Sequence, residues 1–187
     1  YIGDWSSDVC SSDLAACGPA LLDVHTDTDH HRSVLTLAGR DLQDAARAAR
    51  DLTDEVAERL DLSGHRGVHP RLGAVDVVPF VALAPTPAST AVEAAREYAE
   101  WVVAAHGVPV FLYGDADPLA RSLPEARRDA FRTRAPDLGP AEPHPRLGAV
   151  AVGARPPLVA INVELATDDL ELARRVAARS EEHTSEL

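Results

Sequence analysis

The chain has 187 residues, 45% of them hydrophobic, and its 30 acidic and 18 basic residues give a formal net charge of −12. This length is enough for a domain with a sizeable core. The acidic balance argues against generic nucleic-acid binding. No apolar run approaches the roughly 20 residues of a membrane-spanning helix, so we expect no membrane association.

Strands and helices are expected to mix along the chain. Apolar runs predict strands at 20–25, 33–38, 74–83, 108–113, 149–154 and 158–165. Apolar residues at helical spacing predict helices at 41–60, from a capping box at Thr90 and Glu93 to Gly107, at 124–132, and after Thr167. The strand pairs at both ends exclude a strictly alternating parallel fold. We therefore predict an α+β sandwich, a mixed β-sheet covered by helices on one face.

Both ends of the chain resemble translated sequencing adapter. Residues 179–187 read RSEEHTSEL and residues 4–14 read DWSSDVCSSDL, and two such matches favour this interpretation over an unusual polar terminus. We therefore expect 1–14 and 179–187 to be adapter-derived. Cys17 is then the only cysteine of the native segment, so no intrachain disulfide is expected, which is compatible with a reducing cytoplasm.

The stretch 65–80 combines charge, flexible backbone and titratable side chains at the start of a strand. It reads HRGVHPRLGAVDVVPF, so that His65 and His69 lie among Arg66 and Arg71. An imidazole that titrates near neutrality can accept and donate a proton, and a guanidinium can hold a carboxylate. The pattern is typical of a catalytic loop built for proton transfer on an anionic substrate.

This stretch closely resembles the signature of glutamate formiminotransferases, H-x-G-x-H-P-R-x-G-A-x-D-V-x-P-F. By that resemblance His69 is the catalytic residue, a general acid and base. The implied reaction moves the formimino group of N-formimino-L-glutamate to N5 of tetrahydrofolate, a co-substrate, in histidine degradation. The resemblance also implies two α/β subdomains around a folate-binding tunnel, in a cytoplasmic enzyme that is a homodimer. His65, Arg66 and Arg71 are expected to support the site.

Part of the signature is repeated later in the chain. The heptapeptide HPRLGAV occurs at 69–75 and again at 144–150. The second copy lies where the family carries a folate-contacting loop, G-P-x-x-x-x-P-x-x-G. The implied folate-binding residues are Gly139, Pro140, Ala141, Glu142, Pro143, His144, Pro145, Arg146, Leu147 and Gly148. Leu147 replaces the aromatic residue of the animal enzymes, and Arg146 can supply a cation for a folate carboxylate.

Three further side chains are candidates for support of the site. Asp23 and Arg32 match the family segment L-L-D-x-x-x-x-x-x-x-N-R-[ST]-V, in which His31 replaces the usual Asn. A plain turn role at the end of a strand is an equal alternative for Asp23. Asp76 lies in an apolar strand, and because a buried carboxylate needs a partner, we expect it to orient His65 or an arginine.

Two other functions were weighed against this one. His65 and His69 are four residues apart, as in helical zinc pairs, but Gly67 and Pro70 argue against a helix. We therefore expect no metal, and a metal-dependent hydrolase is the weaker alternative. The second alternative is a non-catalytic folate-binding or scaffold protein on the same domain.

The resemblance also divides the chain. It implies an N-terminal subdomain over 15–155 that lacks its first strand, and the truncated start of a C-terminal subdomain over 156–178. The chain by itself is expected to be inactive. The resemblance leaves open whether the parent protein carries a cyclodeaminase domain, and whether formimino or formyl donors are preferred.

Overall fold

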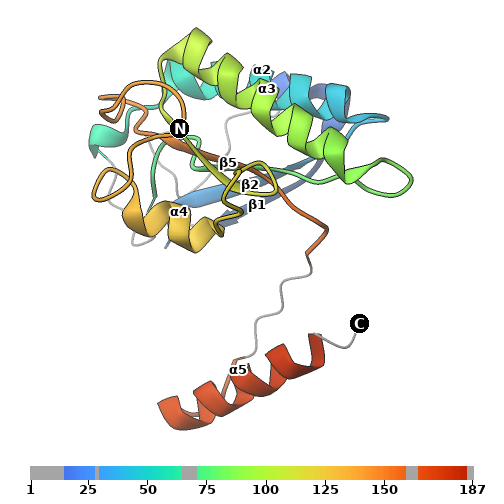
Figure 1. The fold of residues 1–187 in the computed structure, drawn as a ribbon, viewed down its shortest axis with the longest axis vertical. Coiled ribbons are helices and arrows are strands. Elements are labelled where there is room, and N and C mark those ends of the chain that lie inside the picture. The colour runs from blue at the N-terminus through green and yellow to red at the C-terminus, as the bar shows by residue number, and fades with distance from the viewer. Residues whose placement is uncertain (1–14, 28–29, 65–70, 159–163, 185–187) are drawn as a thin grey trace. The chain divides into compact units, whose positions relative to one another are not determined.

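The computed structural model describes residues 15–27, 30–64, 71–158 and 164–184 (Figure 1). The chain divides into two compact units, Tyr1–Pro157 and Leu158–Leu187. The stretch 65–70, which carries the predicted catalytic residue His69, lies outside the described residues. The predicted strand at 158–165 also lies largely outside them. No helix in the described ranges combines the length and apolar character of a membrane span.

The first unit contains the strands and α-helices expected from the sequence, in the expected order, together with the short 3₁₀ helices η1 and η2, which were not predicted. They are η1 (Gly18–Ala20), β1 (Leu21–Asp27), β2 (Arg32–Leu37), α2 (Leu42–Arg59), η2 (Leu62–Gly64), β3 (Val77–Phe80), α3 (Ala88–His106), β4 (Val110–Gly114), α4 (Leu123–Asp129) and β5 (Val150–Ala154). The second unit contains α5 (Leu170–Thr184). Only β3 is much shorter than predicted, because residues 71–76 turn before the strand begins.

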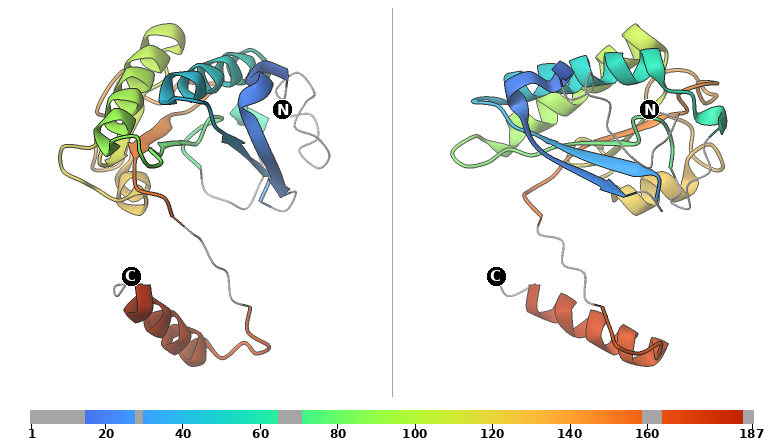
Figure 2. Two further views of the ribbon diagram at one scale, coloured as in Figure 1. Left: turned by 90° about the vertical axis from the view of Figure 1, so that its right-hand side faces the viewer. Right: turned by 180° about the vertical axis from the view of Figure 1, so that it is seen from behind.

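The strands form two separate hydrogen-bonded sheets. β1 and β2 make an antiparallel pair in which Asp27 faces Arg32 and Leu21 faces Leu37. β3, β5 and β4 make a parallel sheet with β5 in the middle. Figure 2 shows the antiparallel pair as a ribbon beside the helices. The predicted α+β class is confirmed, with its mixed strand directions divided between the two sheets.

The parallel sheet is buried on both faces. Alternate residues of β4 and β5, including Val110, Leu112 and Val152, join the main core, to which α2 and α3 contribute on one side of the sheet. Phe111 and Ala151 point to the opposite face, where α4 packs (Figure 1). Burial on both faces explains why these strands read as continuous apolar runs. The two long helices share one face of the sheet, whereas the short α4, which was expected on that face as well, covers the other.

The helix ends follow sequence signals, with one correction. Gly107 ends α3 in the left-handed conformation (φ 65°), as predicted. The capping box predicted at Thr90 is wrong, because α3 already begins at Ala88, after Pro87, and the Thr90 amide donates to the Pro87 carbonyl. A capping box does form at α4, where Ser122 and Glu125 bond reciprocally.

The described part of the first copy of the heptapeptide, residues 71–75, lies against the second copy where β3 and β5 begin. The Ala74 amide donates to the Leu147 carbonyl and the Ala149 amide donates to the Leu72 carbonyl, both at 2.9 Å. Gly73 and Gly148 face each other in this antiparallel bridge. A Cβ on Gly73 would lie 2.0 Å from the Ala149 oxygen, so the backbones can approach this closely only with glycine.

We predict that Gly148→Ala destabilises the protein far more than Gly107→Ala. Both glycines have positive φ, 70° and 65°, so each substitution carries the roughly 1–2 kcal/mol cost of a left-handed alanine. The Cβ at position 148 would in addition lie 2.2 Å from the Leu72 oxygen, whereas nothing lies within 4 Å at position 107. Urea unfolding measures both free energies. Equal losses for the two variants would mean that the crossing tolerates a side chain.

Candidate functional site

The segment 65–70 is not described, but the residues on both sides of it are. On the preceding side, the Leu62 amide donates to the Arg146 carbonyl at 2.9 Å. On the following side, Leu72 and Ala74 bond to the second copy of the heptapeptide, as described above. The chain that carries His65, Arg66 and His69 therefore leaves and re-enters the described structure beside the loop 139–148.

Arg71 connects the end of this segment to the β1–β2 turn. Its Nη2 donates to the carbonyl oxygen of His31 at 2.5 Å and to that of His30 at 3.3 Å. His31 itself has a positive φ of 54°. At position 31, where the family carries Asn, the backbone carbonyl thus accepts a hydrogen bond from Arg71, the arginine of the signature. Asn is among the residues that tolerate this left-handed conformation best.

Asp76 organises the turn that precedes β3. Its Oδ1 accepts a hydrogen bond from the Leu72 amide at 2.7 Å, and its Oδ2 accepts one from Nη2 of Arg127 on α4. Of the two partners predicted for Asp76, the structure therefore shows an arginine. Sequence reasoning missed Arg127 itself. The signal that could have found it is the partly buried carboxylate of Asp76, which requires a nearby cation.

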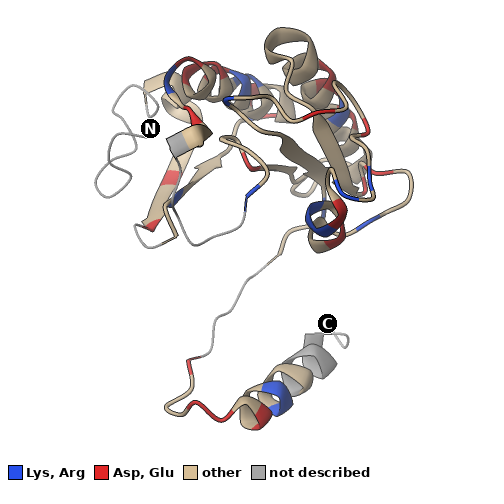
Figure 3. Ribbon diagram, turned by 90° about the vertical axis from the view of Figure 1, so that its left-hand side faces the viewer, with Lys and Arg blue, Asp and Glu red and all other residues tan. Residues whose placement is uncertain are grey.

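Arg32, Arg71 and Arg127 gather at this end of the structure. Burial lowers the pKa of the Arg71 guanidinium, and the positive charge of Arg32 lowers it further. Burial likewise lowers the pKa of Arg127, with added repulsion from Arg32 and Arg71. Figure 3 shows basic positions in blue on α4 and on the segment that follows the grey trace of residues 65–70. Three mutually repelling guanidinium groups create a local positive field within an acidic chain.

The predicted residue Asp23 lies away from this cluster. It is exposed on β1 opposite Thr36, whereas Arg32 stands opposite Asp27 at the other end of the hairpin. Four residues along a strand separate the two positions by roughly 13 Å. The structure therefore brings Arg32, Arg71 and Asp76 together with Arg127, and leaves Asp23 outside the group.

Part of the order in the loop 139–148 comes from hydrogen bonds within the loop itself. The amides of His144 and Gly148 each donate to the other's carbonyl at 2.8 Å. Nδ1 of His144 accepts from the amides of Arg146 and Leu147, at 3.2 and 3.0 Å. Leu147 is only 7% exposed and packs in the main core, which explains an aliphatic residue at this position. The folate contacts predicted for the ten residues of this loop stay predictions.

Arg146 has a structural role that the sequence did not reveal. Its Nη2 donates to the carbonyls of Ala57, Glu58 and Leu60, at 3.2, 3.4 and 3.0 Å. These carbonyls lie at the C-terminal end of α2, where they lack helical partners and carry the negative end of the helix dipole. Arg146 thus fastens the loop to α2, beside the start of the undescribed segment.

A buried ionic network holds the residues that precede the loop 139–148. Asp117 is 3% exposed and accepts hydrogen bonds from Nε of Arg121 at 2.5 Å and from Nη2 at 2.9 Å. Arg121 and Arg134 both reach Asp137, whose Oδ2 accepts from the Leu112 amide of β4 at 2.7 Å. Burial by itself would raise the pKa of Asp117, but the bonds from Arg121 and from backbone amides lower it to about 2.

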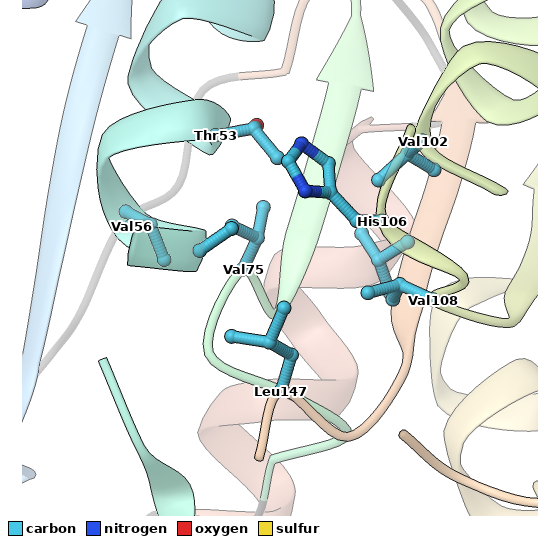
Figure 4. A pocket seen from close by; sticks show the side chains of 9 residues that line it. Thr53, Val56, Val75, Val102, His106, Val108 and Leu147 are labelled. Atoms are coloured by element: carbon cyan, nitrogen blue, oxygen red, sulfur yellow. The ribbon is translucent and has the colours of Figure 1, made fainter. Parts of the chain in front are cut away.

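A small cavity between α2, α3 and the sheet does not qualify as a substrate site. Figure 4 shows His106 extending towards Thr53, with Val75 and Leu147 beside it. The space holds no more than about one water molecule. His106 bonds through Nε2 to Asp54 at 2.7 Å, which ties the two helices together. The cavity is therefore a packing gap within the core.

Within the described ranges, no group of three or more His, Cys, Asp or Glu side chains is arranged to hold a metal ion. His65 and His69 lie outside those ranges. The expected absence of a metal therefore stays a prediction.

Comparison with known proteins gives a consistent family. Residues 9–155 match the family model described as the formiminotransferase domain, N-terminal subdomain. The chain is 40% identical over 171 residues to a glutamate formimidoyltransferase of Streptococcus pyogenes, covering 86% of this chain and 57% of the relative. A glutamate formimidoyltransferase of Thermoplasma acidophilum is 37% identical over 171 residues, covering 84% and 56%. A formimidoyltransferase-cyclodeaminase of Sus scrofa is 34% identical, covering 86% and 31%.

The chain thus spans little more than half the length of the first two relatives and about a third of the last. The family match ends at residue 155 and begins at residue 9, inside the stretch 1–14 that we assigned to adapter. The adapter assignment and the subdomain boundaries stay predictions.

Arg146→Ala should lower the free energy of unfolding by about 1–2 kcal/mol, because it removes a charged donor from the α2 terminus. Urea unfolding measures this loss, and Arg132→Ala, at an exposed arginine after α4, is the matched control. Equal stability of the two variants would contradict the capping role.

The predicted folate contact of Arg146 has a separate test. In a full-length protein, Arg146→Ala should raise the Michaelis constant for tetrahydrofolate, measured at a temperature where the variant is folded.

Stability should fall as the pH drops from about 4 towards 2, in part through Asp117. Its pKa is about 2 in the folded protein and ordinarily 3.8, so the folded state favours the ionised carboxylate and loses that advantage across this window. Asp117→Asn should flatten the pH dependence of the unfolding free energy there. The exposed Asp115→Asn serves as the control. A slope unchanged from wild type in Asp117→Asn would rule out this linkage.

Proposed function

Because the chain belongs to the formiminotransferase family, we propose that it is part of a glutamate formimidoyltransferase. The reaction transfers the formimino group from N-formimino-L-glutamate to N5 of tetrahydrofolate, as part of histidine degradation and one-carbon metabolism. His69 is the general acid and base. Tetrahydrofolate is a co-substrate and no metal takes part. A cytoplasmic location and a homodimeric full-length parent are proposed from the resemblance alone.

The observation that supports this most directly is the arrangement around 65–70. The loop 139–148 bonds to the chain on both sides of that segment, through Arg146 before it and Leu147 after it. The described residues that flank the segment 65–70 therefore lie against the loop 139–148, although about 70 residues or more separate them from it in sequence. Such a meeting is expected where a catalytic loop and a co-substrate loop serve one reaction.

The chemistry makes three demands that these residues can meet. The attacking N5 must lose a proton, and the departing glutamate nitrogen must gain one. A histidine that titrates near neutrality suits both steps. The third demand is that the substrate carboxylate be held so that the reacting atoms stay close. Arg71 and Arg32, whose charges meet beside this segment, suit that purpose.

A non-catalytic folate-binding or scaffold protein is the alternative. It would retain the loop 139–148 and the domain but would have no need of a proton carrier. The presence of His69 within an unbroken signature favours the enzyme. Assay of a full-length protein that contains this chain separates the two functions, because a scaffold would bind tetrahydrofolate without transferring the formimino group.

We predict that His69→Gln lowers turnover by roughly 10²–10⁴-fold in that full-length protein, the usual contribution of a general acid–base group. Glutamine keeps the approximate size but cannot titrate, so the pH–rate profile should also lose the limb that reports the histidine. Tetrahydrofolate affinity, measured by calorimetry, should change little.

His65→Gln is the matched control, since it removes an imidazole from the same segment and should cause a smaller loss. If His65→Gln proves the more damaging, the two roles are exchanged. Near-parental turnover in both variants would refute histidine catalysis in this segment.

A further inference from the structure

Arg127 has more hydrogen-bonding capacity than the described structure uses. A guanidinium carries five N–H donors in a planar fork. Only Nη2 has an acceptor, the Oδ2 atom of Asp76, and the buried Nε has none among the described residues. The side chain is about a fifth exposed, so a ligand can reach it. One carboxylate therefore leaves most of this donor surface unused.

The surroundings of Arg127 add to that imbalance. Arg32 and Arg71 lie close enough for their charges to act on it, and the three groups repel one another. Repulsion between partly buried cations costs free energy, and a lone lysine or a backbone amide would suffice as a partner for Asp76. An anion that binds between the guanidinium groups would relieve the repulsion and accept the remaining donors.

The position of this cluster favours a substrate anion. Arg71 follows the segment 65–70 directly, and Asp76 ties Arg127 to the turn at 71–76 through the Leu72 amide. α4 thereby brings a cation from a distant part of the sequence to the turn that follows the proposed catalytic segment. A planar carboxylate matches a guanidinium fork in shape as well as charge.

We propose that Arg127 is a substrate-binding residue that, beside Arg71, receives the side-chain carboxylate of the glutamyl substrate. This inference rests on the proposed function and extends it, since neither the signature nor the repeated heptapeptide includes α4. It assigns Arg127 two tasks. One guanidinium nitrogen holds Asp76 and so the turn, and the remaining donors bind the substrate.

The test is equilibrium binding of L-glutamate, the proposed leaving product, to a full-length protein containing this chain. L-glutamine is the neutral comparison, because it replaces the side-chain carboxylate by an amide of similar shape. Calorimetry on Arg127→Met should show roughly 10- to 100-fold weaker glutamate binding with little change for glutamine, the usual effect of losing a charged hydrogen bond. Arg128→Met, at an exposed arginine of the same helix, should bind both ligands as wild type does.

Two results would overturn the proposal. One is an equal loss for glutamate and glutamine in Arg127→Met, which indicates a purely structural role. The other is a glutamate-specific loss of the same size in Asp76→Asn, which indicates that Arg127 acts only through the turn. If Arg127→Met fails to fold, Arg127→Lys keeps the charge without the fork. Its preference for glutamate over glutamine should drop several-fold, and an unchanged preference would also refute the proposal.

The outcome is separable from that of the proposed function. A wild-type protein that transfers the formimino group, but whose Arg127 variants keep their glutamate preference, retains the function and loses this inference. A protein that shows an Arg127-dependent preference for glutamate but transfers no formimino group retains the site and loses the function.

Discussion

The close crossing of two backbones, Leu72–Ala74 over Leu147–Ala149, is the constraint on which the rest of the site depends. The crossing needs a glycine on each of the two segments, Gly73 and Gly148. It also fixes where β3 and β5 start within the parallel sheet. The same crossing places Leu72, two residues after the segment 65–70, beside the end of the loop 139–148. The two copies of the repeated heptapeptide thus supply the two segments of the chain that cross at this place.

Around this crossing, arginines from four parts of the chain perform different tasks. Arg71 bonds to backbone carbonyls of the β1–β2 turn, Arg146 to those of the α2 terminus, and Arg127 to the carboxylate of Asp76. Arg32 adds its positive charge to that of Arg71. Guanidinium groups suit such positions because they stay charged when partly buried and present several donors in one plane. The acidic chain concentrates positive charge where an anionic substrate is proposed to bind.

Arg146 illustrates how one residue type supports two interpretations. A family resemblance suggests contact with a folate carboxylate, whereas the described geometry directs the guanidinium to the carbonyls at the end of α2. The two are compatible only if donors beyond Nη2 reach the co-substrate. The network of Asp117, Arg121 and Asp137 lies on the other approach to the loop and holds it to β4. The loop is therefore positioned from both ends by charge.

The sequence by itself determined the order of the strands and helices, the α+β class and the family, because apolar periodicity and a long signature are local properties. It also indicated that Asp76 needs a partner. Only the tertiary structure decided that this partner is Arg127, that Arg146 reaches α2, and that Asp23 lies away from the arginines. These contacts join residues far apart in sequence. Nothing in the local pattern of one chain specifies which distant cation folding will bring to a given carboxylate.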